Sequence, residues 1–454
     1  MSKLTSQTPA LALGRLIETG AITPRDATEF YLDRIAQTDR DHRIYWRLTE
    51  ARARAEADAA GKRAKSGLRR HPLDGVPLSW KDLFDTKGTI TTGGSLAMSN
   101  RVPDNDAAVL TQATASGSIC LGKTAMTEIA FSGLGINPTC GTPANAYDET
   151  TERAPGGSSS GAAVALARGL CAGSIGTDTG GSVRIPAAWN GLVGLKTTAG
   201  RLSLKGTLPL SPTFDTVGPL ARDVADANAL FSLLSGEAPF DISEADLRQV
   251  SLCLPGGVGW SELDEGIGDA VDGALRRLLK AGIRIVEQSL PALDAIDALA
   301  WGGGASRLVA EAYARWAPIL ENHRLDIFSP VYERVMAGAA ITPADLEAAD
   351  KQRAAITAAY LDQTRDIDVV ALPCVAISPP SIASLEQGGP DYFKANRMAL
   401  RNTTLGNQLG LCAITLPVGH DVTGIPVGLM LQAAPHAEER LLKIASAIEK
   451  ALRH

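Results

Sequence analysis

The sequence predicts an α/β protein in which a single large β-sheet is covered by helices on both faces. Short apolar segments that end at Gly or Pro alternate along the chain with helical segments, as in a layered α/β fold. The 454 residues are 45% apolar and 21% charged, as in a globular protein with a large core. Because no repeat or low-complexity linker divides the chain, we expect one domain spanning 1–454.

The N-terminal part of the chain, 1–65, is predicted to be helical. Within 23–39, Thr23 is suited to cap a helix and Pro24 is suited to its first turn. The basic run at 61–70 follows an Ala-rich segment and contains no aromatic residues. It therefore indicates the solvated end of a helix rather than an RNA-binding site.

Strands and helices alternate in the rest of the chain. Buried strands are predicted at 75–85, 118–124, 369–373 and 413–419. Further helices are predicted at 107–117, 160–169 and 439–453. The mainly helical pattern of 256–365 fits either a cap over a site or an ordinary outer layer.

Charge and cysteine content exclude several classes of partner. The 44 basic and 50 acidic residues give a net charge of −6, which is not typical of a nucleic-acid or membrane-binding surface. The six cysteines have no C-x-x-C spacing, so we expect reduced thiols. Arg15 and Glu18 interrupt the apolar run near the N-terminus, and no segment has the roughly 18 apolar residues that span a bilayer. We expect a cytoplasmic protein.

The stretch 154–187 is rich in Gly and Ser. A flexible linker is excluded because the apolar run 162–167 lies inside it. A phosphate-binding loop is excluded because no Lys follows the glycines in the required register. The pattern G-x-S-x-G fits 157–161 with Ser159 as nucleophile, but the polar segment before it is no buried strand. That alternative also needs a histidine base, for which the sequence offers His323, His420 and His436.

Longer motifs give a more specific interpretation. The segments "PGGSSSGAAVALARG", "GTDTGGSVRIPA" and "GLVGLKTTAGRLS" resemble the signature of the amidase signature family of serine hydrolases. Upstream, "GVPLSWKDLFDTKGTITTGGS" resembles the lysine-bearing strand of that family, and "DVVALP", "GNQLGLCAITLPVG" and "GIPVGLMLQ" resemble its closing segments. The resemblance implies one mixed sheet, a signature core at 66–235, amide hydrolysis, and no metal or cofactor.

The resemblance also implies three catalytic residues. Ser182 occupies the position of the nucleophile, Ser158 that of a bridging serine after a cis peptide bond, and Lys81 that of the base. A serine hydroxyl needs an adjacent base, and lysine acts as one only when neutral. Apolar neighbours of Lys81 would desolvate its ammonium group and lower its pKa. No histidine is then required.

The glycines before the nucleophile predict an oxyanion hole. Backbone N–H groups can converge on one oxygen where no side chain obstructs them, and the predicted donors are Thr179, Gly180, Gly181 and Ser182. Three neighbours are assigned supporting roles: Thr177 as a local hydrogen-bonding residue, and Asp178 with Arg184 as a buried ion pair.

A substrate pocket is predicted from two segments. The turn-rich segment 131–141 resembles the one that lines the acyl pocket of the family, although an ordinary turn-rich connection also accounts for it. Trp80 replaces a smaller residue before the base and either narrows one side of the pocket or fills the core behind it. The predicted lining residues are Trp80, Phe131, Ser132 and Gly133. Lys123 is assigned a structural role because one reaction needs one base. The sequence LKTT at 195–198 departs from the commoner K-P-T of the family.

We expect an amidase that resembles free-standing bacterial enzymes and converts a small carboxamide into an acid plus ammonia or an amine. The alternatives are the glutamine-hydrolysing subunit of a tRNA-dependent amidotransferase, and a non-catalytic protein that retains the fold. The sequence does not identify the amide. A homodimer is expected on general frequency.

Overall fold

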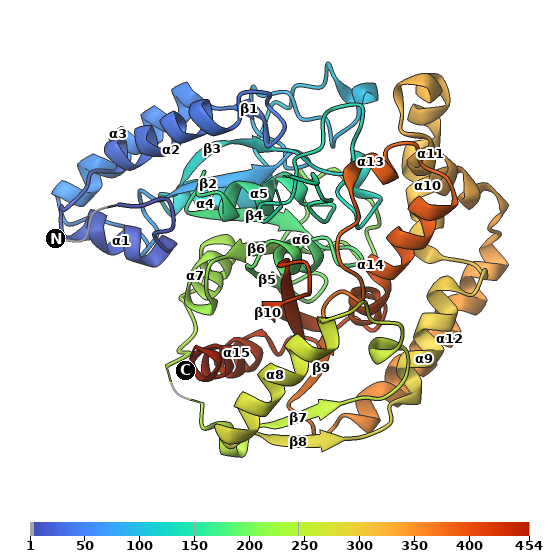
Figure 1. Ribbon diagram of the computed structural model, residues 1–454. Helices are drawn as coiled ribbons and strands as arrows, with labels where there is room; N and C mark the ends of the chain where they lie inside the picture. Colours follow the sequence, from blue (N-terminus) through green and yellow to red (C-terminus); the bar gives the residue numbers. More distant parts are fainter. Residues whose placement is uncertain (1–3, 149, 244, 454) are drawn as a thin grey trace.

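The computed structural model describes residues 4–148, 150–243 and 245–453. Its centre is a mixed sheet that contains eleven strands within these residues (Figure 1). The strand order is β1-β3-β2-β4-β6-β5-β10-β11-β9-β7-β8. Strand β2 is parallel to β3 and β4, and β7 is parallel to β8 and β9, whereas the other neighbours are antiparallel. The predicted fold class is confirmed.

The strand bounds are β1 Tyr45–Leu48, β2 Pro77–Lys81, β3 Ile119–Thr124, β4 Gly173–Thr177, β5 Val193–Lys196, β6 Val217–Ala221, β7 Ser251–Leu254, β8 Arg284–Glu287, β9 Val369–Pro373, β10 Cys412–His420 and β11 Pro426–Ala433. The four strands predicted from the sequence are observed as β2, β3, β9 and β10.

The α-helices are α1 Ala10–Glu18, α2 Pro24–Thr38, α3 Glu50–Lys65, α4 Ala108–Ala115, α5 Ser160–Ala167, α6 Arg184–Trp189, α7 Val224–Ser235, α8 Ile267–Lys280, α9 Pro291–Trp301, α10 Arg307–Leu320, α11 Ser329–Met336, α12 Pro343–Gln363, α13 Ile382–Leu385, α14 Pro390–Gln408 and α15 Glu438–Leu452. Short 3-10 helices are η1 Leu96–Met98, η2 Glu128–Ala130, η3 Leu247–Gln249, η4 Val258–Trp260, η5 Glu321–Asp326 and η6 Ala337–Ala340. None of the described helices is both long and apolar enough to cross a membrane.

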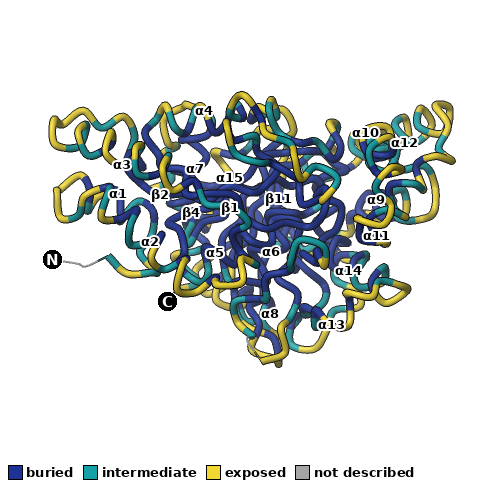
Figure 2. The backbone as a smooth tube through the Cα atoms, turned by 90° about the horizontal axis from the view of Figure 1, so that it is seen from above, coloured by how far each residue is buried: buried dark blue, intermediate teal, exposed yellow. Residues whose placement is uncertain are grey.

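Helices cover the two faces of the sheet. On one face, α5 packs on β2, β3, β4 and β6, and α6 packs on β5, β10 and β11. On the other face, α7 packs on β5 and β6, and α15 packs on β10 and β11. Seen from above, the strands form a buried centre and the exposed residues lie on the outer helices and loops (Figure 2). Every residue of α5 except its last, Ala167, is buried, as expected for a helix without a polar face.

The N-terminal prediction is right for its helices and wrong for one segment. Helix α2 begins as expected, because the Thr23 hydroxyl accepts the Asp26 N–H at 3.1 Å and Pro24 is its first residue. Residues 45–48, however, form the edge strand β1, which pairs antiparallel with β3. Tyr45 and Trp46 favour extended backbone over helix. The predicted domain ends, 1–3 and 454, lie outside the described residues.

Residues 256–365 contain α8 to α12 and one strand, β8. The helices α9 to α12 lie together at one side of the sheet (Figure 1). The loop between α9 and α10 and parts of α10, α11, η6 and α12 line a cavity that also contains Ser182. This block therefore forms one wall of a cavity, so part of it lies against the candidate site.

Candidate active site

The Gly/Ser-rich stretch contains two turns that lie close together, one before α5 and one between β4 and α6. The peptide bond between Gly157 and Ser158 is cis, and α5 starts two residues later. Strand β4 then leads into the loop 178–183, which ends at α6. Gly157 is packed so tightly that a Cβ atom on it would lie 2.5 Å from the backbone nitrogen of Gly135. The backbone therefore requires glycine at 157.

Lys81 is the last residue of β2 and is fully buried. Its Nζ donates to the Ser158 hydroxyl at 2.7 Å and to the Thr177 hydroxyl at 2.9 Å. Burial lowers the pKa of Lys81 to about 7, although the charges of Asp215 and Asp178 act in the opposite direction. A large fraction of Lys81 is thus neutral near pH 7.

Ser182 lies in the loop 178–183 and lines the cavity with 4% of its surface exposed. Its carbonyl accepts the Ser159 N–H at 3.2 Å, which ties the two serine-bearing segments together. Among the described residues, the Ser182 hydroxyl has no hydrogen-bond partner. The structure thus joins Lys81 to Ser158 directly and places Ser182 beside them through the backbone.

The four N–H groups of residues 179–182 make no intramolecular hydrogen bond within the described part of the chain. The loop is held by other groups: the Thr403 hydroxyl donates to the Gly180 carbonyl at 2.6 Å, and Asp178 and Thr216 exchange backbone hydrogen bonds of 2.8 and 3.2 Å. Gly181 has φ +138°, a conformation that side chains disfavour. The loop therefore has unused backbone donors on a fixed backbone.

Asp178 and Arg184 form a fully buried ion pair behind this loop. Arg184 donates to the two carboxylate oxygens at 3.0 and 2.9 Å. Asn407, which the sequence analysis missed, donates to Asp178 at 2.8 Å and accepts from Arg184 at 2.6 Å. Burial raises the pKa of Asp178, but the charge and hydrogen bonds of Arg184 together with Lys196 and Asn407 outweigh burial and keep that pKa well below its usual value. Buried Lys196 adds a nearby positive charge.

Asp215 is a second buried acid that sequence reasoning did not select. It accepts the Thr179 hydroxyl at 2.6 Å, and the N–H groups of Leu210 and Ser211 at 2.9 and 3.1 Å. Burial raises the pKa of Asp215 to about 6. Because it bonds to Thr179, this carboxyl group holds the start of the loop that carries Ser182.

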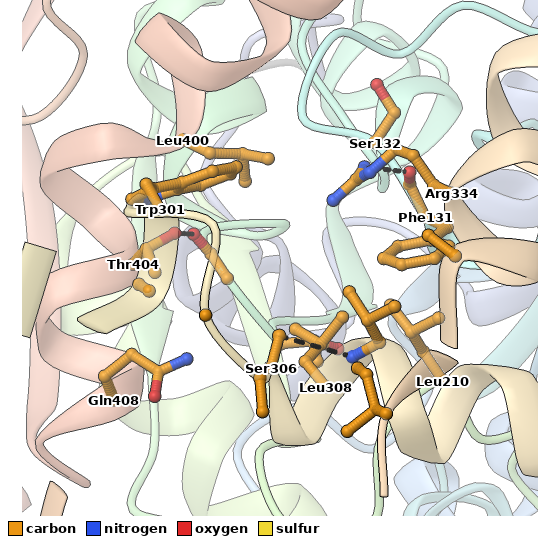
Figure 3. Close-up of a pocket in the computed structure, with 18 of the residues that line it drawn as sticks. Phe131, Ser132, Leu210, Trp301, Ser306, Leu308, Arg334, Leu400, Thr404 and Gln408 are labelled. Carbon is orange, nitrogen blue, oxygen red and sulfur yellow. Dashed lines mark hydrogen bonds between the residues drawn. The ribbon is translucent and has the colours of Figure 1, made fainter. Parts of the chain in front are cut away.

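A cavity of about 620 Å³ opens beside Ser182 (Figure 3). Apolar side chains of Phe131, Trp301 and Leu400 form much of its wall, and Thr404 and Gln408 of α14 contribute polar groups. The full lining consists of Ala130, Phe131, Ser132, Thr179, Gly180, Ser182, Leu210, Ala300, Trp301, Gly303, Gly304, Ala305, Ser306, Leu308, Val309, Arg334, Ala337, Ala340, Ile341, Asp345, Leu400, Thr404 and Gln408.

Two of the four predicted pocket residues line this cavity and two do not. Phe131 and Ser132 are lining residues. Trp80 is fully buried against Phe84, with ring centroids 5.4 Å apart. Successive residues of a strand face opposite sides, so Trp80 points away from the face on which Lys81 meets Ser158. Gly133 lies behind the wall, where its N–H donates to Asn396 at 2.9 Å. The assignments of Trp80 and Gly133 to the pocket are therefore corrected.

The remaining candidates have local partners. Lys123 is fully buried and lies 3.3 Å from Asp82, a structural ion pair. The Ser159 hydroxyl donates to the Thr177 carbonyl at 3.4 Å, and none of its hydrogen bonds within the described chain involves a histidine. All six cysteines are free. Among the described residues, no group of three or more His, Cys, Asp or Glu side chains is arranged to hold a metal ion.

Comparison with known proteins decides the family. The profile of the family described as Amidase matches residues 26–442. This chain belongs to the amidase family. A 2-amino-5-chloromuconic acid deaminase of Comamonas testosteroni is 37% identical over 88% of this chain and 86% of its own length. A glutamyl-tRNA(Gln) amidotransferase subunit of Anaeromyxobacter dehalogenans (strain 2CP-C) is 32% identical over 98% of each chain.

A solved amidase structure has a TM-score of 0.87 and 34% identity, covering 97% of this chain and 99% of the other. The expected family, fold and enzyme class are confirmed: this amidase is an amide-hydrolysing enzyme.

Proposed function

We propose that this amidase cleaves a small carboxamide through an acyl-enzyme on Ser182. Ser158 relays protons and neutral Lys81 acts as the base. The observation that carries the proposal is the 2.7 Å hydrogen bond between Lys81 Nζ and Ser158 Oγ, next to a serine that lines a cavity. Lys81 has the reduced pKa that a base near neutral pH requires.

The reaction proceeds in two steps, acylation of Ser182 and hydrolysis of the resulting ester. Ser182 Oγ attacks the amide carbonyl carbon while its proton passes to Ser158 and the Ser158 proton passes to Lys81. The tetrahedral oxyanion accepts hydrogen bonds from N–H groups among residues 179–182. Collapse breaks the C–N bond, and the proton held by Lys81 returns through Ser158 to the leaving nitrogen. Water then attacks the ester by the same proton path and releases the acid and Ser182.

The proton relay requires the hydroxyls of Ser182 and Ser158 to meet. No hydrogen bond joins them in the free enzyme within the described residues, and catalytic hydrogen bonds often tighten only when substrate binds. The Ser182 hydroxyl is otherwise uncommitted. We propose that it turns towards Ser158 in the substrate complex.

The proposal is tested by supplying a panel of primary amides and measuring ammonia and acid together. We expect equal amounts of both products. Added hydroxylamine should divert the acyl-enzyme to a hydroxamate. Product formation without any hydroxamate would contradict a Ser182 ester. A wild-type enzyme that is silent on every amide would favour a non-catalytic protein.

A glutamine-hydrolysing subunit is the second candidate, because the amidotransferase relative covers almost the whole chain. Such a site must accommodate the α-ammonium group of glutamine. Among the described lining residues the acidic one is Asp345, whose carboxylate accepts the Thr342 hydroxyl at 2.6 Å as part of a helix cap. We therefore rank the free-standing amidase first. Activity on glutamine that appears only with co-purified partner proteins would reverse this order. Cytoplasmic location and a homodimer stay predictions.

The pH dependence follows from Lys81. Because the base must be neutral, kcat/KM for an uncharged amide should rise with pH through about 7 and fall in acid. The measurement is ammonia release from butyramide between about pH 5.5 and 8.5, with thermal unfolding recorded at each pH to show that the fold persists. A flat profile over that range would contradict the neutral-lysine mechanism.

Gly181 provides a test of the oxyanion loop. A Cβ atom on Gly181 would lie 2.1 Å from the Thr403 hydroxyl oxygen, so Gly181→Ala must displace the loop. We expect kcat to fall about 100-fold, the scale of one lost oxyanion donor. Gly180→Ala should cost less, because its Cβ would make ordinary 3.5 Å contacts with Leu400. The control is Gly256→Ala, which has open space. Equal rates in all three variants would contradict the assignment of residues 179–182 as the oxyanion hole.

A further inference from the structure

The cavity beside Ser182 contains an arginine that the proposed reaction does not use. Arg334 lies on α11 and lines the cavity. Its Nη1 donates to the Phe131 carbonyl at 2.5 Å, and its guanidinium carbon stacks 4.0 Å from the centre of the Phe131 ring. These contacts fix the plane of the guanidinium group. Most of its five N–H donors remain available.

Arg334 has no acidic partner. Within the described residues, no carboxylate lies within 4.0 Å of its guanidinium, in contrast to Arg184, which is paired with Asp178. Burial lowers the pKa of Arg334 to about 10, so the group stays cationic at neutral pH. Asp345 also lines the cavity, but it is engaged with the N-terminus of α12.

Arg334 is half-buried. An unpaired cation in a partly apolar cavity is costly, because it loses part of its hydration and no protein anion replaces it. A ligand anion would supply the missing partner. Arginine is well suited to this role because its planar donors match the two oxygens of a carboxylate. Figure 3 shows the guanidinium directed into the cavity, with Trp301, Leu400 and Gln408 across from it. A substrate that reaches Ser182 therefore shares the cavity with this charge.

We propose that Arg334 binds a carboxylate of the substrate, so that the enzyme prefers amides that also carry a free carboxylate over neutral amides of the same size. The inference rests on the proposed amidase function. The apolar wall formed by Phe131, Trp301 and Leu400 would contact the carbon chain between the carboxylate and the amide. Gln408, whose side chain has no partner within the described residues, is placed to hydrogen-bond a further polar group of the substrate.

The test compares isosteric substrates. Malonamate, succinamate and glutaramate place the carboxylate in the acyl part, with 3-methylbutanamide, 4-methylpentanamide and 5-methylhexanamide as neutral controls. Butyrylglycine places the carboxylate in the leaving amine, with N-isobutylbutyramide as its control. We expect wild-type kcat/KM to be about 100-fold higher for at least one charged amide than for its neutral control. A preference among the acyl-side amides would show that Arg334 binds a carboxylate of the acyl part. A preference for butyrylglycine would show that it binds a carboxylate of the leaving amine.

Variants separate recognition from folding. In Arg334→Gln the ratio of kcat/KM between each charged amide and its neutral control should fall below about 5-fold, and Arg334→Lys should be intermediate. Arg353→Gln is the matched control, because Arg353 also stacks on an aromatic ring, 5.2 Å from the centre of Phe214, but lies outside the lining. It should keep the full preference.

A measurement on the wild-type enzyme does not depend on any variant. Glutarate should inhibit hydrolysis of a neutral amide much more strongly than butyrate. Hydrolysis of neutral and charged amides at equal rates would overturn the carboxylate site and leave the amidase function intact. A preference that survives in Arg334→Gln would also overturn it. If no amide of either kind is hydrolysed, the proposed function fails and this inference falls with it.

Discussion

Replacing Ser182 with alanine should lower kcat on every amide substrate by about 10⁶-fold, the scale on which loss of the serine nucleophile acts in serine hydrolases. The variant has no oxygen to form an acyl-enzyme, whereas its backbone donors at 179–182 remain. We therefore expect substrate to bind with little change. Residual turnover should be slow and should yield no hydroxamate. Single-turnover ammonia release, with binding measured by calorimetry, separates these two effects.

Substitution of the other two members of the triad, Lys81 and Ser158, should give large but unequal losses of kcat. Lys81→Met removes the base, and Ser158→Ala breaks the path between base and nucleophile. Because residues of such a unit act together, the triple variant should be little slower than Ser182→Ala alone. Ser160→Ala is the matched control, since the Ser160 hydroxyl is buried in the same stretch and has no hydrogen-bond partner within the described chain. If Ser182→Ala retained a tenth of the wild-type rate, Ser182 would not be the nucleophile.

The sequence predicted the parts of the site that belong to continuous motifs. Ser158 and Ser182 lie in one Gly/Ser-rich stretch, and the resemblance to the family selected these two serines and Lys81. The apolar neighbours of Lys81 then indicated that burial could lower its pKa. The pKa of Lys81 is lowered by burial at the end of β2, which is the cause that the sequence indicated. The sequence did not predict the state of the Ser182 hydroxyl, which depends on side-chain orientation rather than on residue spacing.

Residues supplied by distant segments could not be predicted. Asp215, Arg334 and Asn407 carry no motif of their own, and each acquires a role only when tertiary packing brings it to the loop or cavity. The error at Trp80 has a different origin: proximity in sequence to Lys81 suggested proximity in space, but strand alternation places neighbours on opposite faces. Residues 45–48 show that a helical pattern around a short segment does not prevent an edge strand.

Removing the buried charge of Asp178 should be the most destabilising change near the site. Asp178→Ala leaves Arg184 buried without its counter-ion, which typically costs about 3–5 kcal/mol in the free energy of unfolding. Asn407 would also lose its acceptor. The control is the exposed pair of Lys351 and Glu347, 2.7 Å apart, where Glu347→Gln should change stability by less than about 0.5 kcal/mol. Denaturant unfolding monitored by circular dichroism measures both values.

The pH dependence of this loss distinguishes a charge effect from a cavity effect. The pKa of Asp178 is lowered in the folded protein, so its contribution to stability is present above the unfolded value of 3.8 and declines as pH falls below it. The stability difference between wild type and Asp178→Asn, which keeps the volume, should therefore be constant from about pH 5 upwards and shrink in acid. A difference that is independent of pH down to about pH 3 would mean that packing, and not the ion pair with Arg184, fixes the loop that carries Ser182.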